Sequence, residues 1–84
     1  MVRLVFLGKF RDSAPADLRE IVLPEDVRTL SDIKEWVGRR VPALGQAIAA
    51  AHTRMVLNQN LAHDMSAIVR DGDEIAFLPP MSGG

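Results

Sequence analysis

The residues of this sequence whose types could do chemistry lie at its C-terminal end, where two prolines lead into Met81-Ser82-Gly83-Gly84. Glycine has no side chain, so Gly83 and Gly84 can pass through a channel too narrow for any other residue. A carboxylate at Gly84 is anionic near neutral pH and a poor electrophile, so it must be activated before it can transfer a group. The ending therefore predicts that the activated carboxyl group of Gly84 is the reactive centre, with Gly83 beside it.

Two final glycines are a weak signal when they are taken alone. Glycine makes up about 7% of average proteins, so chance produces such an ending in roughly one chain in 200. An expression remnant or an irrelevant disordered end is therefore an alternative. The context favours a functional tail, because the last predicted strand runs directly into six residues that span about 20 Å when extended. That length is sufficient to reach the active site of another protein.

The rest of the chain offers little other reactive chemistry. It contains no cysteine, which excludes disulfides, thiolate metal sites and a persulfide carried on a side chain. His52 and His63 lack neighbours at zinc-ligand spacing, so we interpret both as surface residues. The acidic residues 71, 73 and 74 lie in a segment too short for a calcium loop, which favours a turn. We therefore expect no bound metal or cofactor, and no catalysis by this chain alone.

Composition limits the class of protein. The chain has 84 residues, enough for one small domain with a single core. Hydrophobic residues make up 48% and charged residues 25%, as in ordinary globular proteins. The net charge is -1, which gives no basic surface for nucleic acid or anionic lipid. No apolar run approaches the roughly 20 residues that span a bilayer, so we expect a cytoplasmic protein without a membrane partner.

The first part of the sequence predicts two strands and then a helix. Residues 2–7 are mostly apolar with two β-branched valines, and they predict a strand. Residues 9–17 are largely polar and form the turn of a hairpin, and residues 18–23 return as a strand that Pro24 ends. Thr29 with Asp32 three residues later is a helix N-cap pattern. Apolar residues at three- and four-residue steps follow this cap, at Leu30, Ile33, Trp36 and Val37.

The second part predicts a short helix and several short strands. Pro42 can open the helix at its first turn. Residues 55–57 are a strand candidate, residues 58–60 have turn chemistry, and residues 68–69 form a brief extended stretch before the turn at 71–73. The last strand covers residues 74–78 and ends at Pro79 and Pro80.

This order of elements predicts an α+β fold, with a mixed sheet and a helix packed across one face. Strand alternation places Val2, Leu4, Phe6, Ile75 and Phe77 beneath the helix. The opposite side, which we call the far face, then carries Val5, Leu7, Ala76 and Leu78. No predicted helix covers the far face, so it is a candidate partner surface. We expect one domain over residues 1–78 and a flexible diglycine tail over residues 79–84.

The final stretch, residues 71–84, resembles the small, sulfur-carrying subunits of molybdopterin synthase, which have a ubiquitin-like β-grasp fold. The resembling features are an acidic glycine turn, an aromatic strand, two prolines, two variable residues and a diglycine end. The opening residues 2–11 and the segment 56–59 also look like this family, and the length and order of elements agree over the whole chain.

The resemblance implies a carrier function. Gly84 would be adenylated by an ATP-using enzyme related to ubiquitin activators, and converted to a thiocarboxylate with sulfur from a sulfurtransferase. The tail would then enter the large subunit of molybdopterin synthase and give sulfur to cyclic pyranopterin monophosphate, which builds the dithiolene that binds molybdenum or tungsten. A terminal thiocarboxylate stores sulfur without a thiol side chain, which agrees with the missing cysteine.

The resemblance also implies a set of partner contacts. These map onto Leu7, Arg11, Leu61 and Leu78, together with the tail residues Pro79, Pro80, Met81 and Ser82. Positions 7 and 78 are often aromatic in the family, and leucine keeps an apolar contact there. For Leu61, burial in the core is an equally good interpretation.

Three other functions stay open at this point. The chain could carry sulfur for thiazole or another metabolite, or it could be a ubiquitin-like modifier whose Gly84 is joined to lysines. It could also be an interaction domain whose tail has no function.

Overall fold

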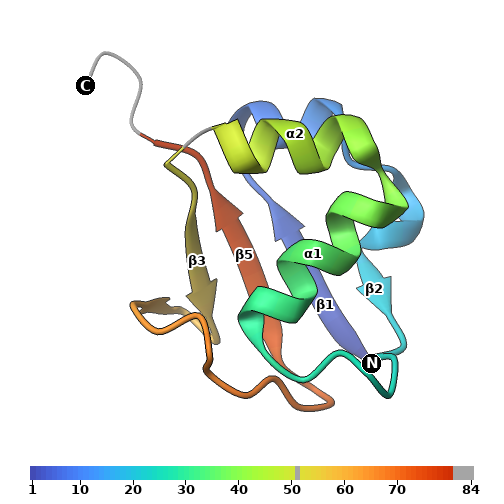
Figure 1. Cartoon of the computed structure of the whole chain (residues 1–84), viewed down its shortest axis with the longest axis vertical. Helices are drawn as coiled ribbons and strands as arrows, with labels where there is room; N and C mark the ends of the chain where they lie inside the picture. The colour runs from blue at the N-terminus through green and yellow to red at the C-terminus, as the bar shows by residue number, and fades with distance from the viewer. Residues whose placement is uncertain (51, 81–84) are drawn as a thin grey trace.

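The computed structural model of the chain describes residues 1–50 and 52–80. In this part, five strands form one sheet and two helices pack against it (Figure 1). The strands are β1 (Val2–Phe6), β2 (Glu20–Ile21), β3 (Arg54–Leu57), β4 (Asn60–Ala62) and β5 (Glu74–Leu78), and the helices are α1 (Leu30–Arg40) and α2 (Pro42–Ala50). The order across the sheet is β2-β1-β5-β3-β4, so the first and last strands of the chain are neighbours inside it.

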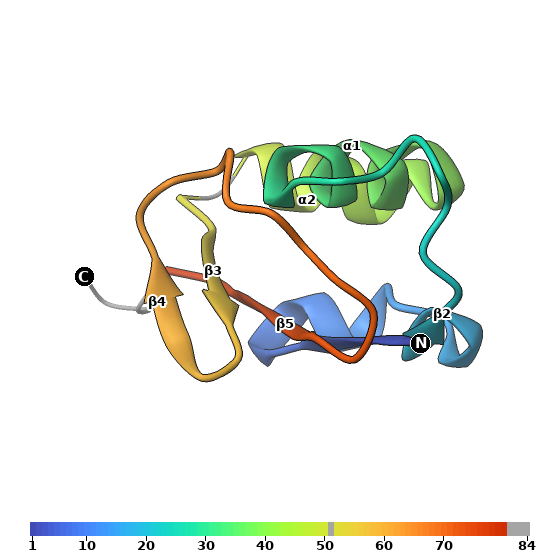
Figure 2. The same cartoon turned by 90° about the horizontal axis from the view of Figure 1, so that it is seen from below.

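The sheet is mixed. β1 and β5 are parallel, whereas the other neighbouring pairs are antiparallel. A parallel pair needs a long crossover, and here the crossover contains both helices and the remaining strands. Figure 2 shows α1 and α2 on the same side of the sheet. The predicted mixed sheet with a helix across one face is therefore confirmed, and α2 is a second helix on that face.

The hydrophobic core lies between the sheet and the helices. Val2, Leu4 and Phe6 of β1 are buried there together with Ile75 and Phe77 of β5. The rings of Phe6 and Phe77 stack with their centroids 4.9 Å apart. The predicted alternation of these two strands is therefore confirmed.

Helix α1 begins at the predicted cap. The Thr29 hydroxyl oxygen accepts a hydrogen bond from the Asp32 N–H at 3.1 Å. The Asp32 carboxylate accepts from the backbone N–H groups of Arg28 at 3.0 Å and of Thr29 at 3.1 Å. These two hydrogen bonds hold the pKa of Asp32 below its usual value, and the bond from the Arg28 N–H has the larger effect. A reciprocal cap of this kind fixes where the helix starts.

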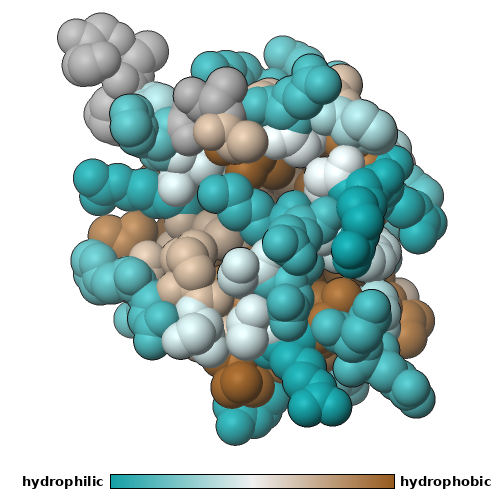
Figure 3. Space-filling model, viewed as in Figure 1, coloured by the Kyte–Doolittle hydropathy of each residue, from teal (hydrophilic) through white to brown (hydrophobic). Residues whose placement is uncertain are grey.

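The apolar stripe of α1 faces the sheet. Leu30, Ile33 and Val37 are fully buried. Trp36 is only partly buried at the margin of the core, and the guanidinium of Arg40 lies 5.4 Å from its ring centroid. The stripe is thus confirmed, with Trp36 at its edge. The outer surface on the helix side is mostly hydrophilic (Figure 3).

The connection from β1 to β2 differs from its prediction. Two short 3₁₀ turns replace a plain polar turn, and the returning strand is much shorter than residues 18–23. The turns cover Gly8–Asp12 and Ala16–Leu18, and β2 is only Glu20–Ile21.

Burial explains the short strand. Phe10 and Leu18 are both buried, so the connection follows the core instead of continuing the sheet. The Leu18 N–H donates to the Pro15 carbonyl at 3.1 Å, which closes the second turn. Val22 is 75% exposed and lies beyond the strand. The burial of two apolar side chains outweighs the extra ladder hydrogen bonds that a longer β2 would form.

A two-residue turn joins β3 to β4. Asn58 and Gln59 both have positive φ, 49° and 70°, as a type I′ hairpin requires. The turn predicted over residues 58–60 is confirmed except that Asn60 already belongs to β4. Asn58 also ties this hairpin to β5, because its side-chain oxygen accepts from the Glu74 N–H at 2.8 Å and its amide donates to Asp73 Oδ1 at 2.9 Å.

The two helices approach closely where glycines face each other. A Cβ built on Gly45 would lie 2.5 Å from Gly38 Cα and 3.3 Å from the Gly38 carbonyl carbon and oxygen. A Cβ built on Gly38 would lie 3.5 Å from Gly45 Cα, which is ordinary contact. The crossing therefore tolerates a side chain on one helix and excludes it on the other.

We predict that Gly45→Ala lowers the free energy of unfolding by about 1–3 kcal/mol, because a backbone clash forces the helices apart. Gly38→Ala is the matched control. It should leave stability unchanged or raise it by up to ~1 kcal/mol, since alanine is the better helix former. Urea unfolding of both variants measures this, and equal destabilisation would contradict the asymmetric contact.

Candidate functional site

The tail leaves the domain beside the end of β1. β5 ends at Leu78, after which Pro79 is partly buried and Pro80 is exposed. Gly8, two residues beyond β1, has a φ of +56°, and a Cβ built on it would lie 2.8 Å from Pro79 Cγ. Gly8 thus provides both the left-handed conformation and the space that Pro79 occupies. This contact sets where the tail begins.

One row of side chains crosses the far face at the middle of the strands. Val5 of β1 lies beside Ala76 of β5, Ala76 lies opposite Val56 of β3, and Val56 lies opposite Leu61 of β4. Side chains paired in this way point to the same side of a sheet. The four residues therefore form a continuous apolar row over four strands.

A second row lies nearer the tail. The Leu7 N–H donates to the Phe77 carbonyl at 3.1 Å, which continues β1 beside Leu78. Arg54 of β3 lies opposite Leu78. The apolar part of the face therefore reaches the start of the tail and is bordered there by the arginine.

Neither helix covers the far face (Figure 2). Its residues Val5, Leu7, Val56, Ala76 and Leu78 are partly buried by their neighbours in the sheet, and none belongs to the core cluster. Leu61 is 40% exposed, which decides against burial in the core. The far face is thus an apolar surface formed by the uncovered side of the sheet.

Charges border this surface. Arg54 is exposed at the second row, and Arg11 is exposed on the 3₁₀ turn that follows β1. At the other end of the face, Arg3 and Glu74 pair at 3.5 Å across β1 and β5. The end of the far face near the tail is therefore basic, whereas its opposite end carries the ion pair of Arg3 with Glu74.

The structure brings most of the predicted contact residues together. Leu7, Leu61 and Leu78 share the far face, and Arg11 lies on the connection next to it. Pro79 and Pro80 begin the tail at the end of this face. Met81, Ser82, Gly83 and Gly84 lie outside the described residues. The role of these residues in partner binding stays a prediction.

Val56 belongs to the face but was not assigned to it from the sequence. Its side is set by the hairpin register, in which Leu57 pairs with Asn60 and Val56 with Leu61. The observed two-residue turn, Asn58 and Gln59, fixes this pairing of β3 with β4. The turn predicted over residues 58–60 leaves the pairing undefined, so the sequence did not assign a side to Val56. The signal was present in the asparagine of the turn, which tolerates positive φ.

Other chemistry is sparse in the part of the chain that the structure describes. These residues include no group of three histidine, cysteine or acidic side chains that could hold a metal ion. His52 and His63 are both exposed. Asp73 accepts the Arg70 N–H at 2.7 Å, so the acidic segment forms the predicted turn. None of the described helices is long and apolar enough to cross a bilayer.

The sequence profile of the ThiS family matches residues 4–84. The chain belongs to the ThiS family. The molybdopterin synthase sulfur carrier subunit of Haemophilus influenzae is 29% identical over 84 residues, 100% of each chain. The protein of the same name from Mycobacterium tuberculosis is 26% identical over 99% of this chain and 96% of its own.

A solved structure agrees with the fold. Small archaeal modifier protein 1 from Methanosarcina acetivorans superposes with a TM-score of 0.73 at 22% identity, over 99% of this chain and 95% of that chain. The mixed sheet with both helices on one face is the ubiquitin-like β-grasp, as the resemblance implied. The fold places the last strand inside the sheet, so the tail of this ThiS-family chain starts from a firmly held strand.

We predict that Gly8→Ala lowers the free energy of unfolding by about 1–2 kcal/mol, because alanine is strained at positive φ and its Cβ meets the Pro79 ring. Pro79→Ala removes the ring atoms that cause the clash. The double variant should therefore recover part of the loss, which a double-mutant cycle from urea unfolding measures. Additive effects would show that Pro79 does not lie against Gly8.

Proposed function

We propose that this chain is a sulfur carrier, and specifically the small subunit of a molybdopterin synthase. The carboxyl group of Gly84 receives sulfur as a thiocarboxylate and donates it to cyclic pyranopterin monophosphate in the biosynthesis of the molybdenum cofactor. The observation that carries the proposal is the full-length similarity to curated sulfur carrier subunits of molybdopterin synthase. The family match extends to residue 84 and so includes the diglycine end.

The chemistry needs two partner enzymes. In the first step, a carboxylate oxygen of Gly84 attacks the α-phosphate of ATP on an activating enzyme of the ubiquitin-activator type, and pyrophosphate leaves. A sulfur nucleophile at the oxidation level of sulfide, supplied through a sulfurtransferase, then displaces AMP. One oxygen of the carboxylate is thereby replaced by sulfur. The ATP site and the sulfur donor belong to those partners.

The domain acts as the handle for this group. The activating enzyme makes the carboxyl group of Gly84 electrophilic by adenylating it. No side chain of this chain therefore needs to activate that group. The far face gives a partner an apolar surface that ends where the tail begins, so docking there directs the tail into the partner's active site. The large subunit of molybdopterin synthase and the activating enzyme are the expected partners, in the cytoplasm. The chain is not a catalyst alone.

Two other functions use the same tail. A carrier for thiazole or another metabolite would differ only in the acceptor, and binding to a thiazole synthase in place of a molybdopterin synthase large subunit would identify it. A ubiquitin-like modifier would be joined through Gly84 to lysines of other proteins. The likeness to a modifier protein at 22% identity concerns the fold alone.

We predict that the intact chain gains about 16 Da when it is incubated with its activating enzyme, ATP and a sulfur donor, because sulfur replaces oxygen. The variant that lacks Gly84 should show no gain. Its urea unfolding curve should match that of the full chain, because the residue lies beyond the last strand. Mass spectrometry and unfolding together provide the test.

Two results would contradict the carrier proposal. One is an unmodified full chain under conditions in which the activating enzyme charges another carrier. The other is sulfur transfer that continues after Gly84 is deleted. A mass gain equal to a linked lysine peptide would instead support the modifier function.

We also predict that Leu78→Lys weakens binding to the large subunit at least tenfold, because a charge enters the apolar far face where the tail begins. Val22→Lys is the matched control, since Val22 is 75% exposed and lies beyond the end of β2, outside both apolar rows of the far face. It should change affinity less than twofold. Calorimetric titration measures both variants, and their unfolding free energies should stay within ~1 kcal/mol of the parent. Equal weakening by both changes would exclude the far face as the docking surface.

A further inference from the structure

The outer edge of β1 is only partly paired. β2 is two residues long and pairs with Val2 and Arg3 alone. The next contact on this side is a single bond, from the Leu4 N–H to the Arg19 carbonyl at 2.9 Å. The Arg19 N–H turns back to the Ala16 carbonyl at 3.2 Å, so it does not return a bond to β1. Beyond Leu4 the edge therefore has no strand beside it in the described part of the chain.

This leaves backbone groups of an inner strand open. The N–H groups of Arg3 and Leu7 donate to Asp73 and Phe77 on the β5 side. Because N–H direction alternates along a strand, the Phe6 N–H and carbonyl point away from β5, to the outer edge. Among the described residues, neither group has a hydrogen-bond partner. An unpaired strand edge of this kind is a template for another extended chain.

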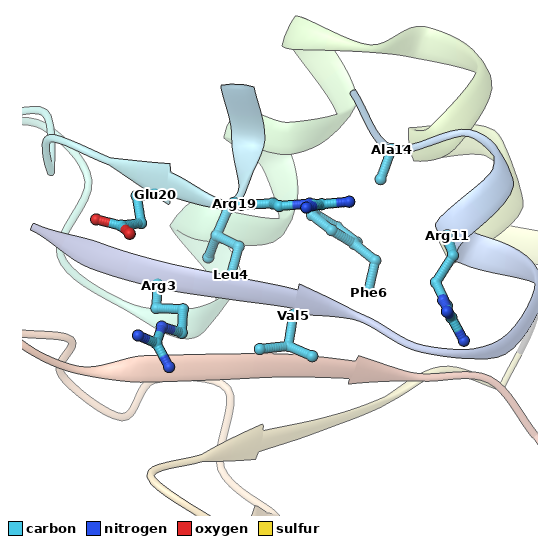
Figure 4. A pocket seen from close by; sticks show the side chains of 8 residues that line it. All are labelled: Arg3, Leu4, Val5, Phe6, Arg11, Ala14, Arg19 and Glu20. Atoms are coloured by element: carbon cyan, nitrogen blue, oxygen red, sulfur yellow. The ribbon is translucent and has the colours of Figure 1, made fainter. Parts of the chain in front are cut away.

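A hollow lies along this open edge. Its volume is about 410 Å³, and it lies between β1 and the connection that carries the two 3₁₀ turns. Figure 4 shows the side chains around it. Leu4, Val5 and Phe6 form its wall on β1, and Ala14 lies on the connection opposite them. The space is sufficient for a short segment of extended chain beside the strand.

The charge around the hollow is strongly basic. Arg3, Arg11 and Arg19 line it, and Glu20 is the only acidic residue among the eight that do. Arg3 already pairs with Glu74. Within the described residues, Arg11 and Arg19 form no ion pair, although both are exposed. Two guanidinium groups, each with donors matched to carboxylate, are thus available at the open edge.

We propose that this hollow binds an extended acidic segment of a partner protein, which adds a strand to the outer edge of β1. The partner backbone pairs with the open Phe6 N–H and carbonyl, and its carboxylates bind the guanidinium groups of Arg11 and Arg19. Backbone pairing supplies affinity that does not depend on sequence, while the arginines select acidic side chains. Both features occur together at this edge of the described sheet.

Glu20 sets the position of the acidic residues in the segment. It lines the hollow near β2, where it would repel a carboxylate. Arg11 is on the first turn and Ala14 follows it, toward the other end. Figure 4 shows the Arg19 side chain extending away from Glu20, so the acidic residues of the partner bind on the side of the hollow away from Glu20.

The proposal does not depend on sulfur transfer. It concerns the edge of the sheet, whereas the carrier chemistry resides in the tail. Loss of the carrier chemistry would leave peptide binding at the edge unchanged. The chain lacking Gly84 should therefore bind an acidic segment with the same affinity as the full chain.

The test uses an eight-residue peptide of alternating valine and glutamate, blocked at both ends and labelled with fluorescein. Fluorescence anisotropy of the full chain with this peptide should show saturable binding. Arg11→Gln and Arg19→Gln should each weaken it about tenfold, as expected for the loss of a charge-assisted hydrogen bond. Arg39→Gln is the matched control, because Arg39 is exposed on α1 away from the hollow, and it should change affinity less than twofold.

A second measurement examines strand addition itself. Saturating peptide should slow hydrogen exchange of the Phe6 amide at least tenfold, because that N–H becomes paired. A peptide of the same sequence with alternate backbone nitrogens methylated should lose binding, since it cannot pair along its edge. Free glutamate at the same carboxylate concentration should not compete.

Several results would overturn the proposal. Equal binding by a peptide with lysine in place of glutamate would remove the role of the arginines. Competition by free glutamate or phosphate, or unchanged exchange at Phe6, would identify a simple anion site without strand addition. An equal effect of Arg39→Gln would show nonspecific attraction between charges.

Discussion

The parallel pairing of β1 with β5 is the interaction on which the rest of the structure depends. It brings the two ends of the chain together, with Leu4 beside Ile75 and Phe6 beside Phe77. Because the strands run in the same direction, both end at the same side of the domain, and Gly8 after β1 therefore meets Pro79 after β5. The tail consequently starts at Pro79, beside two inner strands of the sheet, whose ladder hydrogen bonds and stacked phenylalanines fix the position of this starting point. A terminus attached to an edge strand would fray more easily.

Covering only one face of the sheet has a second consequence. The close approach of Gly38 and Gly45 lets both helices fit over the same strands, so that their apolar stripes and the inner residues form one core. Nothing in the described chain remains to cover the other face. That face consists of small or aliphatic side chains such as Val5, Ala76 and Val56, which partly bury one another.

The sequence was sufficient to predict the features that depend on local pattern. Alternation along β1 and β5 assigned Leu7 and Leu78 to the far face correctly, because each side chain of a strand points to one face of the sheet or to the other. The Thr29 cap was equally clear. The connection after β1 was predicted wrongly because Phe10 is buried on a 3₁₀ turn that packs against α2, and α2 is distant in sequence. The contact between Gly8 and Pro79 joins residues about seventy positions apart, and only the β1–β5 pairing reveals it.

The far face and the hollow along the open edge of β1 are adjacent, since Val5 belongs to the apolar row and also lines the hollow. A partner that covers the far face therefore reaches the open edge of β1 without crossing a gap. The apolar row offers contact area with little directionality, whereas strand pairing at the edge fixes the partner's orientation relative to β1. Orientation relative to β1 is also orientation relative to Pro79, where the tail begins, because Pro79 lies against Gly8 just after β1. An edge contact can thus align the tail with an active site even though it lies on the opposite side of β1 from β5.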